Sequence, residues 1–158
     1  MNSGLVRAAR ADEKQGVLKH NVFTQGPMSE CYSQTGGPPV SIKWVDINKG
    51  DDSDPDYRSR WVGREFKGND RNRDDLFAAT PPLEYLRFLV SRCASSQLGP
   101  RPTKLMVQDV KQAYFYAPAT RDVYVDLPED DMVFDDEGNA LCGKLNNSMH
   151  GTRDTAQN

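Results

Sequence analysis

The chain has 158 residues, 37% of them hydrophobic, and its mean hydropathy of −0.74 is low for a self-sufficient core. The formal net charge of −3 at pH 7 excludes a protein that is basic throughout, so contacts with nucleic acid would need a local basic patch. No apolar run approaches the roughly 18 residues of a membrane-spanning helix, and the N-terminus has no secretory signal pattern. The sequence therefore predicts an intracellular protein, cytoplasmic or nuclear rather than secreted, with no membrane partner.

Residues 1–40 are predicted to be a poorly ordered leader. They combine short polar pieces with glycines and prolines that interrupt regular structure, most densely between Gly26 and Pro39. The remaining residues, 41–158, are expected to form one domain.

Two strands are predicted at residues 41–50 and 57–66, joined by an acidic loop, and together they would form a hairpin. Each strand carries a tryptophan, Trp44 or Trp61, that is expected to pack the hairpin rather than to stack on a base. Between residues 57 and 73 six bases face only two acids, so this segment, which includes the second strand of the hairpin, is the local basic patch. Its bases are Arg58, Arg60, Arg64, Lys67, Arg71 and Arg73.

A helix is predicted from Pro81 to just before Gly99, because apolar residues recur there at helical spacing and Gly99-Pro100 would stop it. The next segment, residues 104–110, has the pattern of a strand with apolar side chains on both faces, and Asp109 lies at its end. An ionised carboxylate at the end of a buried strand is costly unless it is paired or binds a metal. Asp109 is therefore either a ligand for magnesium or the cap of the short turn that follows.

The last part of the chain predicts two short strands, at residues 122–128 and from residue 140 onward. An acidic loop with a turn at Gly138 separates them. The paired acids of this loop are expected to be solvated; they are Asp130-Asp131 and Asp135-Asp136.

Five segments follow one another in a characteristic order: RSRWVGREF (58–66), PPLEYLR (81–87), QDVKQAYF (108–115), DVYVDLP (122–128) and KLNNSMHG (144–151). In this order they resemble the reverse transcriptase of copia-type (Ty1/copia) long-terminal-repeat retrotransposons. A single segment would be a weak signal, whereas the ordered series is specific. The resemblance covers residues 43–153.

The resemblance implies an α+β fold: a truncated polymerase palm, with an antiparallel sheet and helices on one face, preceded by a fingers β-hairpin. The complete enzyme would be an RNA-directed DNA polymerase, a nucleotidyltransferase that uses magnesium, an RNA or DNA primer-template and deoxynucleoside triphosphates. The sequence contains no Tyr-x-Asp-Asp segment, whose paired aspartates would complete the metal site. We therefore expect an amino-terminal fragment of the domain that is inactive alone.

The resemblance also implies roles for individual residues. Asp109 would be the first catalytic metal ligand, with the carbonyl of Val110 as a further ligand. Ala113 and Tyr114 would contact the nucleotide, where the Tyr114 ring would exclude a 2′-hydroxyl and so select deoxynucleotides. Guanidinium groups of the basic segment would clamp the triphosphate and the template backbone; they belong to Arg58, Arg60 and Arg64.

Two other interpretations stay open at this point. The chain is a decayed, non-enzymatic remnant that still binds nucleic acid, since such a remnant would keep the basic segment and lack the aspartate pair. Alternatively, the chain is a small protein-interaction domain in which Asp109 is only a cap and the acidic loop meets a basic partner.

Overall fold

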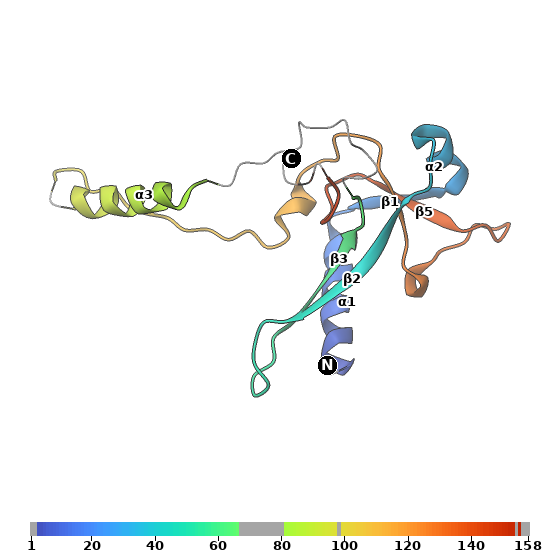
Figure 1. Cartoon of the computed structure of the whole chain (residues 1–158), viewed down its shortest axis with the longest axis horizontal. Helices are drawn as coiled ribbons and strands as arrows, with labels where there is room; N and C mark the ends of the chain where they lie inside the picture. The colour runs from blue at the N-terminus through green and yellow to red at the C-terminus, as the bar shows by residue number, and fades with distance from the viewer. Residues whose placement is uncertain (1–2, 67–80, 98, 154, 156–158) are drawn as a thin grey trace. The chain divides into compact units, whose positions relative to one another are not determined.

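The structure is a computed structural model that describes residues 3–66, 81–97, 99–153 and 155. The chain divides into two compact units (Figure 1). The first unit comprises residues 1–76 and 112–158, and the second comprises residues 77–111. We describe each unit by itself.

The first unit contains a five-stranded sheet made of β1 (Phe23–Pro27), β2 (Val40–Asn48), β3 (Tyr57–Gly63), β4 (Tyr124–Asp126) and β5 (Leu141–Leu145). The strand order is β1-β5-β4-β2-β3 (Figure 1). The predicted α+β class is confirmed, but the sheet is mixed rather than antiparallel throughout, because β2 and β4 pair in parallel. The assignment of palm and fingers stays a prediction.

β2 and β3 form the antiparallel hairpin that the sequence predicts, with Trp44 directly opposite Trp61. The centroids of the two indole rings lie 5.3 Å apart and Trp61 is buried, so the tryptophans pack the hairpin as expected. β3 ends at Gly63 rather than at residue 66, although the Arg64 N–H still donates to the Ser41 carbonyl at 2.8 Å.

Residues 3–40 differ from the poorly ordered leader expected there, since they form α1 (Ser3–Lys19), β1 and α2 (Met28–Thr35). Tertiary contacts hold these residues in regular structure, because Val17 and Val22 belong to the main core and β1 pairs with β5. The glycines separate these elements instead of preventing them. Gly36 ends α2 with φ 70°, a left-handed conformation that costs glycine little.

Two clusters of buried side chains stabilise the first unit. The larger cluster joins α1 to the sheet and to the turns after it; its members are Val17, Val22, Trp61, Phe115, Val123, Val125, Leu145 and Met149. The smaller cluster joins α2 to β4 and β5 through Cys31, Tyr124 and Cys142. The buried Tyr124 hydroxyl donates to Glu30 at 2.7 Å, so its polar end has a partner.

The second unit contains α3 (Leu83–Ser96), which confirms the predicted helix. Residues 102–110 form neither strand nor helix, so the predicted strand ending at Asp109 is wrong. The side chains there are exposed, by 76% for Met106 and 84% for Val107. A strand needs a partner for its backbone N–H and C=O groups, and the described residues of this unit provide no second strand.

Candidate nucleic-acid interface

Asp109 and Val110 lie in the irregular segment after α3, and both are exposed. The burial that would make a carboxylate costly at this position is therefore absent, and the role of Asp109 as a metal ligand stays a prediction. Within the described ranges, no group of three or more His, Cys, Asp and Glu side chains is arranged to hold a metal ion. Asp109 supplies one carboxylate, and a magnesium site in a protein usually combines one or two carboxylates with water and substrate phosphate oxygens.

Ala113 and Tyr114 belong to the first unit and lie in the short 3-10 helix η2 (Ala113–Tyr116). The two neighbouring aromatic side chains of this turn differ in exposure: Phe115 is 1% exposed and lies in the core, whereas Tyr114 is 37% exposed. The Tyr114 ring meets His150 edge-on, with 4.7 Å between the ring centroids. Burial lowers the pKa of His150, and the charge of Arg60 lowers it further. Tyr114 is accessible to a ligand, and Phe115 is not.

Arg58 and Arg60 are exposed because side chains alternate along β3, where Ser59 and Trp61 are buried. Three side chains of β2 lie on the same side as the two arginines, since they are paired with Val62, Arg60 and Arg58. We call this surface the outer face of the hairpin. It consists of Lys43, Val45, Ile47, Arg58, Arg60 and Val62, and no acid is among them.

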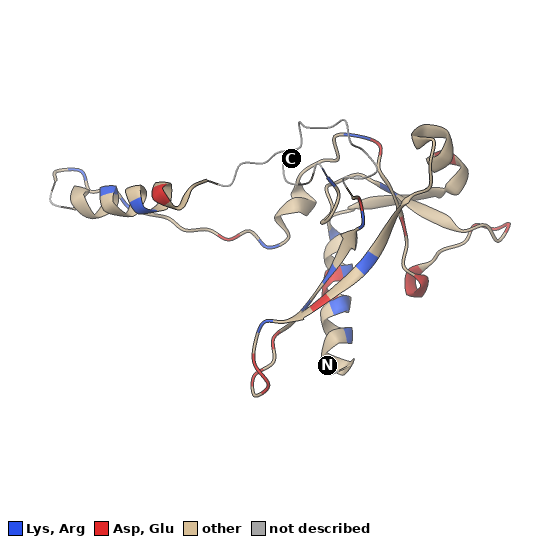
Figure 2. Cartoon of the chain, in the orientation of Figure 1, with Lys and Arg blue, Asp and Glu red and all other residues tan. Residues whose placement is uncertain are grey.

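The acids near this face are either at the tip of the hairpin or engaged elsewhere. Figure 2 shows the tip loop between β2 and β3 in red, and there Asp56 forms an exposed ion pair with Arg58 at 3.5 Å. Such an exposed pair contributes little stability. Glu65 is held by Arg121, with N–O distances of 2.7 Å and 2.5 Å. Arg64 follows β3 and is exposed, whereas Lys67, Arg71 and Arg73 lie outside the described residues.

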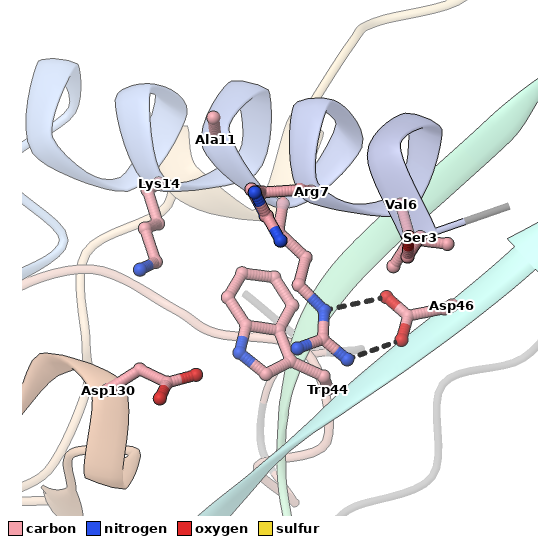
Figure 3. A pocket seen from close by; sticks show the side chains of 9 residues that line it. Ser3, Val6, Arg7, Ala11, Lys14, Trp44, Asp46 and Asp130 are labelled. Atoms are coloured by element: carbon pink, nitrogen blue, oxygen red, sulfur yellow. Dashed lines mark hydrogen bonds and ion pairs between the residues drawn. The ribbon is translucent and has the colours of Figure 1, made fainter.

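The opposite side of the hairpin faces α1 and forms a pocket of about 540 Å³ (Figure 3). Arg10 on α1 donates two hydrogen bonds to the Asp46 carboxylate, at 3.2 Å and 2.6 Å, and the Ser59 hydroxyl donates to the same carboxylate at 2.7 Å. The Arg10 guanidinium lies over the Trp44 ring, 5.0 Å from its centroid. The pocket is lined by Ser3, Val6, Arg7, Arg10, Ala11, Lys14, Trp44, Asp46 and Asp130.

Replacing Asp46 with asparagine is expected to lower the free energy of unfolding by about 1–2 kcal/mol near neutral pH, because Arg10 loses a charged acceptor. The hydrogen bond from Arg10 holds the pKa of Asp46 below its ordinary value of 3.8, against the opposing effect of burial. A lowered carboxyl pKa stabilises the fold above the unfolded-state pKa, and this contribution is lost as the pH falls through the lower pKa of the folded state.

The difference in unfolding free energy between the wild type and Asp46→Asn should therefore shrink between about pH 6 and about pH 3. Urea denaturation followed by tryptophan fluorescence measures it. Asp52→Asn, in the exposed tip loop, is the matched control and is expected to show no comparable effect. A difference that stays constant over this pH range would contradict the proposed ionic contribution of Asp46.

The acids of the 130–136 loop are less uniformly solvated than expected. Asp130 and Asp136 are exposed, but Asp131 accepts a hydrogen bond from Lys14 at 2.6 Å. Asp135 accepts hydrogen bonds from the Asn139 backbone at 2.7 Å and from its side chain at 3.0 Å, which holds the predicted turn. These two acids therefore have structural roles, which speaks against them as substitutes for a catalytic pair.

Local sequence pattern does not reveal the contribution of α1, because the glycines and prolines of residues 1–40 favour a poorly ordered leader. The spacing of Arg7, Arg10 and Lys14 at positions i, i+3 and i+7 places all three on one side of a helix and could have pointed to this surface. In the part of the chain that is described, no helix has both the length and the apolar character needed to cross a membrane.

Comparisons with protein-family models, with curated proteins and with solved structures found no match.

Proposed function

We propose that this chain is the amino-terminal part of a copia-type reverse transcriptase domain, and that the outer face of its β2–β3 hairpin binds the sugar-phosphate backbone of a primer-template. The observation that carries the proposal is the outer face itself, which presents Lys43, Arg58 and Arg60 together with aliphatic side chains and no acid. The five ordered sequence segments support the choice of family.

The spacing of the two arginines suits a phosphate backbone. Arg58 and Arg60 are two residues apart on a strand, so their side chains emerge about 7 Å from each other. This is close to two steps of about 3.4 Å along one nucleic-acid strand. Guanidinium groups at this interval can bind two phosphates of one strand that are two steps apart, and Arg64 extends the series beyond the end of β3.

In the complete enzyme we assign the first magnesium ligands to Asp109 and the Val110 carbonyl, and the contact with the deoxynucleotide to Ala113 and Tyr114. The accessibility of Tyr114 supports its assignment. Nucleotidyl transfer needs carboxylates from more than one motif, and the described residues do not provide them. We therefore assign binding, and no catalytic step, to this chain alone.

Replacing Arg58 and Arg60 together with glutamine is expected to weaken binding of an RNA-DNA primer-template by the full chain. Each phosphate contact that is lost should reduce the slope of log affinity against log salt by about 1, so the slope should fall by about 2. Fluorescence anisotropy over a series of salt concentrations measures both quantities.

The control for this experiment is Lys19→Gln combined with Arg92→Gln, which removes the same charge from two exposed positions outside the outer face. Equal salt slopes for the two double variants would overturn the proposal. No binding by the wild-type chain even at low salt would also overturn it and would favour a protein-interaction domain.

A further inference from the structure

The pocket between α1 and β2 combines a flat cationic surface with a second cation, Arg7, that forms no ion pair with a described carboxylate. Arg7 and Lys14 line it from α1, and Trp44 and Asp46 line it from β2 (Figure 3). Arg10 of α1 is also part of the lining. All of these residues belong to the first unit. The pocket lies on the side of the hairpin opposite to the outer face, so its chemistry is separate from the proposed backbone contact.

The Arg10 guanidinium is preorganised as a stacking surface. Two hydrogen bonds to Asp46 fix its plane, the Ser59 hydroxyl in turn holds Asp46, and the Trp44 ring supports the guanidinium from one side. The Arg10 side chain has an exposed fraction of 34% and lines the pocket, so part of it is accessible there. A fixed, planar guanidinium is a surface on which a nucleic-acid base stacks well.

The distribution of charge singles out Arg7 as the group that would take an anion. Arg10 is paired with Asp46, and Lys14 is paired with Asp131 at 2.6 Å. Arg7 lines the same pocket, and no described carboxylate forms an ion pair with it. Asp130, also in the lining, is an acceptor for an amino or hydroxyl group.

We propose that this pocket binds one nucleotide unit, with its base stacked on Arg10, its phosphate paired with Arg7 and a donor group hydrogen-bonded to Asp130. A simple anion would use Arg7 alone and would make no contact with the supported guanidinium plane. The volume of about 540 Å³ is in the range of small-molecule sites. The nucleotide is either a free mononucleotide or a base of a single strand, since both present the same chemistry.

The test is isothermal titration calorimetry of the full chain with adenosine monophosphate, adenosine, inorganic phosphate and a short oligo-deoxyadenosine. Arg7→Gln is expected to weaken binding of adenosine monophosphate about tenfold, the loss of one charge-assisted hydrogen bond, and to leave adenosine unaffected. Arg10→Lys keeps the charge but removes the plane, so it should weaken both ligands. Lys19→Gln, on the same helix but outside the pocket, is the control and should change neither.

Tighter binding of the oligonucleotide than of adenosine monophosphate, with both weakened by Arg7→Gln, would identify a single strand as the source. Similar affinities would identify the free mononucleotide. The proposal is overturned if inorganic phosphate binds as well as the nucleotide, if nothing binds at millimolar concentration, or if Arg7→Gln behaves like Lys19→Gln. Arg7 is exposed, so this variant is expected to fold even if Arg10→Lys does not. The variant with Arg58 and Arg60 replaced should still bind the mononucleotide, which separates this proposal from that for the hairpin.

Discussion

Replacing Phe115 with alanine is expected to lower the free energy of unfolding of the first unit by about 3–5 kcal/mol. The Phe115 ring is 1% exposed and belongs to the main core cluster. It also lies near two histidine rings, with centroid distances of 6.1 Å to His20 and to His150. Removal of the ring leaves a cavity that these neighbours can fill only partly, and the lost contacts and the cavity both destabilise the fold.

Phe66→Ala is the matched control, because the same side chain is removed in the same unit from a position that is 64% exposed. It is expected to cost less than about 1 kcal/mol. Urea denaturation followed by tryptophan fluorescence is a suitable measurement, since Trp44 and Trp61 both lie in the first unit and report its unfolding. Similar losses for the two variants would contradict the burial of Phe115.

This prediction also affects how the QDVKQAYF segment can be tested. A loss of nucleotide binding after Phe115→Ala would reflect an altered fold, whereas Tyr114 is accessible and its replacement can be interpreted functionally. Tyr114→Phe is the more conservative variant because it keeps the ring that meets His150.

The second large effect is expected for Gly151→Ala, which should lower the free energy of unfolding by about 2–4 kcal/mol. Gly151 has φ 83°, in the left-handed region, where a Cβ atom is unfavourable. A Cβ atom there would also collide with the Gly63 carbonyl oxygen and would lie 2.6 Å from a methyl carbon of Val62. The Gly63 N–H donates to the His150 carbonyl at 2.7 Å, so the collision would push apart a contact that holds the end of β3.

Gly138→Ala separates the cost of the left-handed backbone conformation from the cost of the collision with neighbouring atoms. Gly138 also has φ 83°, but nothing lies within 4 Å of a Cβ atom at this position. Its replacement should therefore cost only the backbone term, about 1–2 kcal/mol. A thermal or urea denaturation series of the two variants gives the difference directly. If both cost the same, the close approach of Gly151 to Gly63 is not a feature of the folded protein.

Local sequence pattern was sufficient for the elements whose partners are close in the chain. The β2–β3 hairpin follows from alternation along two neighbouring segments, and α3 follows from apolar residues at helical spacing before a Gly-Pro stop. The same alternation determined that Arg58 and Arg60 lie on one side of β3 and the buried Ser59 and Trp61 on the other. These features need no knowledge of distant parts of the chain.

Contacts between distant residues decided the rest. Residues 104–110 have a strand-like pattern but no strand, because ladder hydrogen bonds depend on a partner that local pattern cannot provide. α1 has too few apolar residues to stand out, and it is ordered by Val17 in the core and by the pairing of Arg10 with Asp46, 36 residues away. The pocket with Arg7 also depends on contacts between distant residues, because α1 and β2 both line it. Burial and pairing are properties of the assembled chain, since the free energy of an ion pair or an apolar contact depends on what excludes water around it.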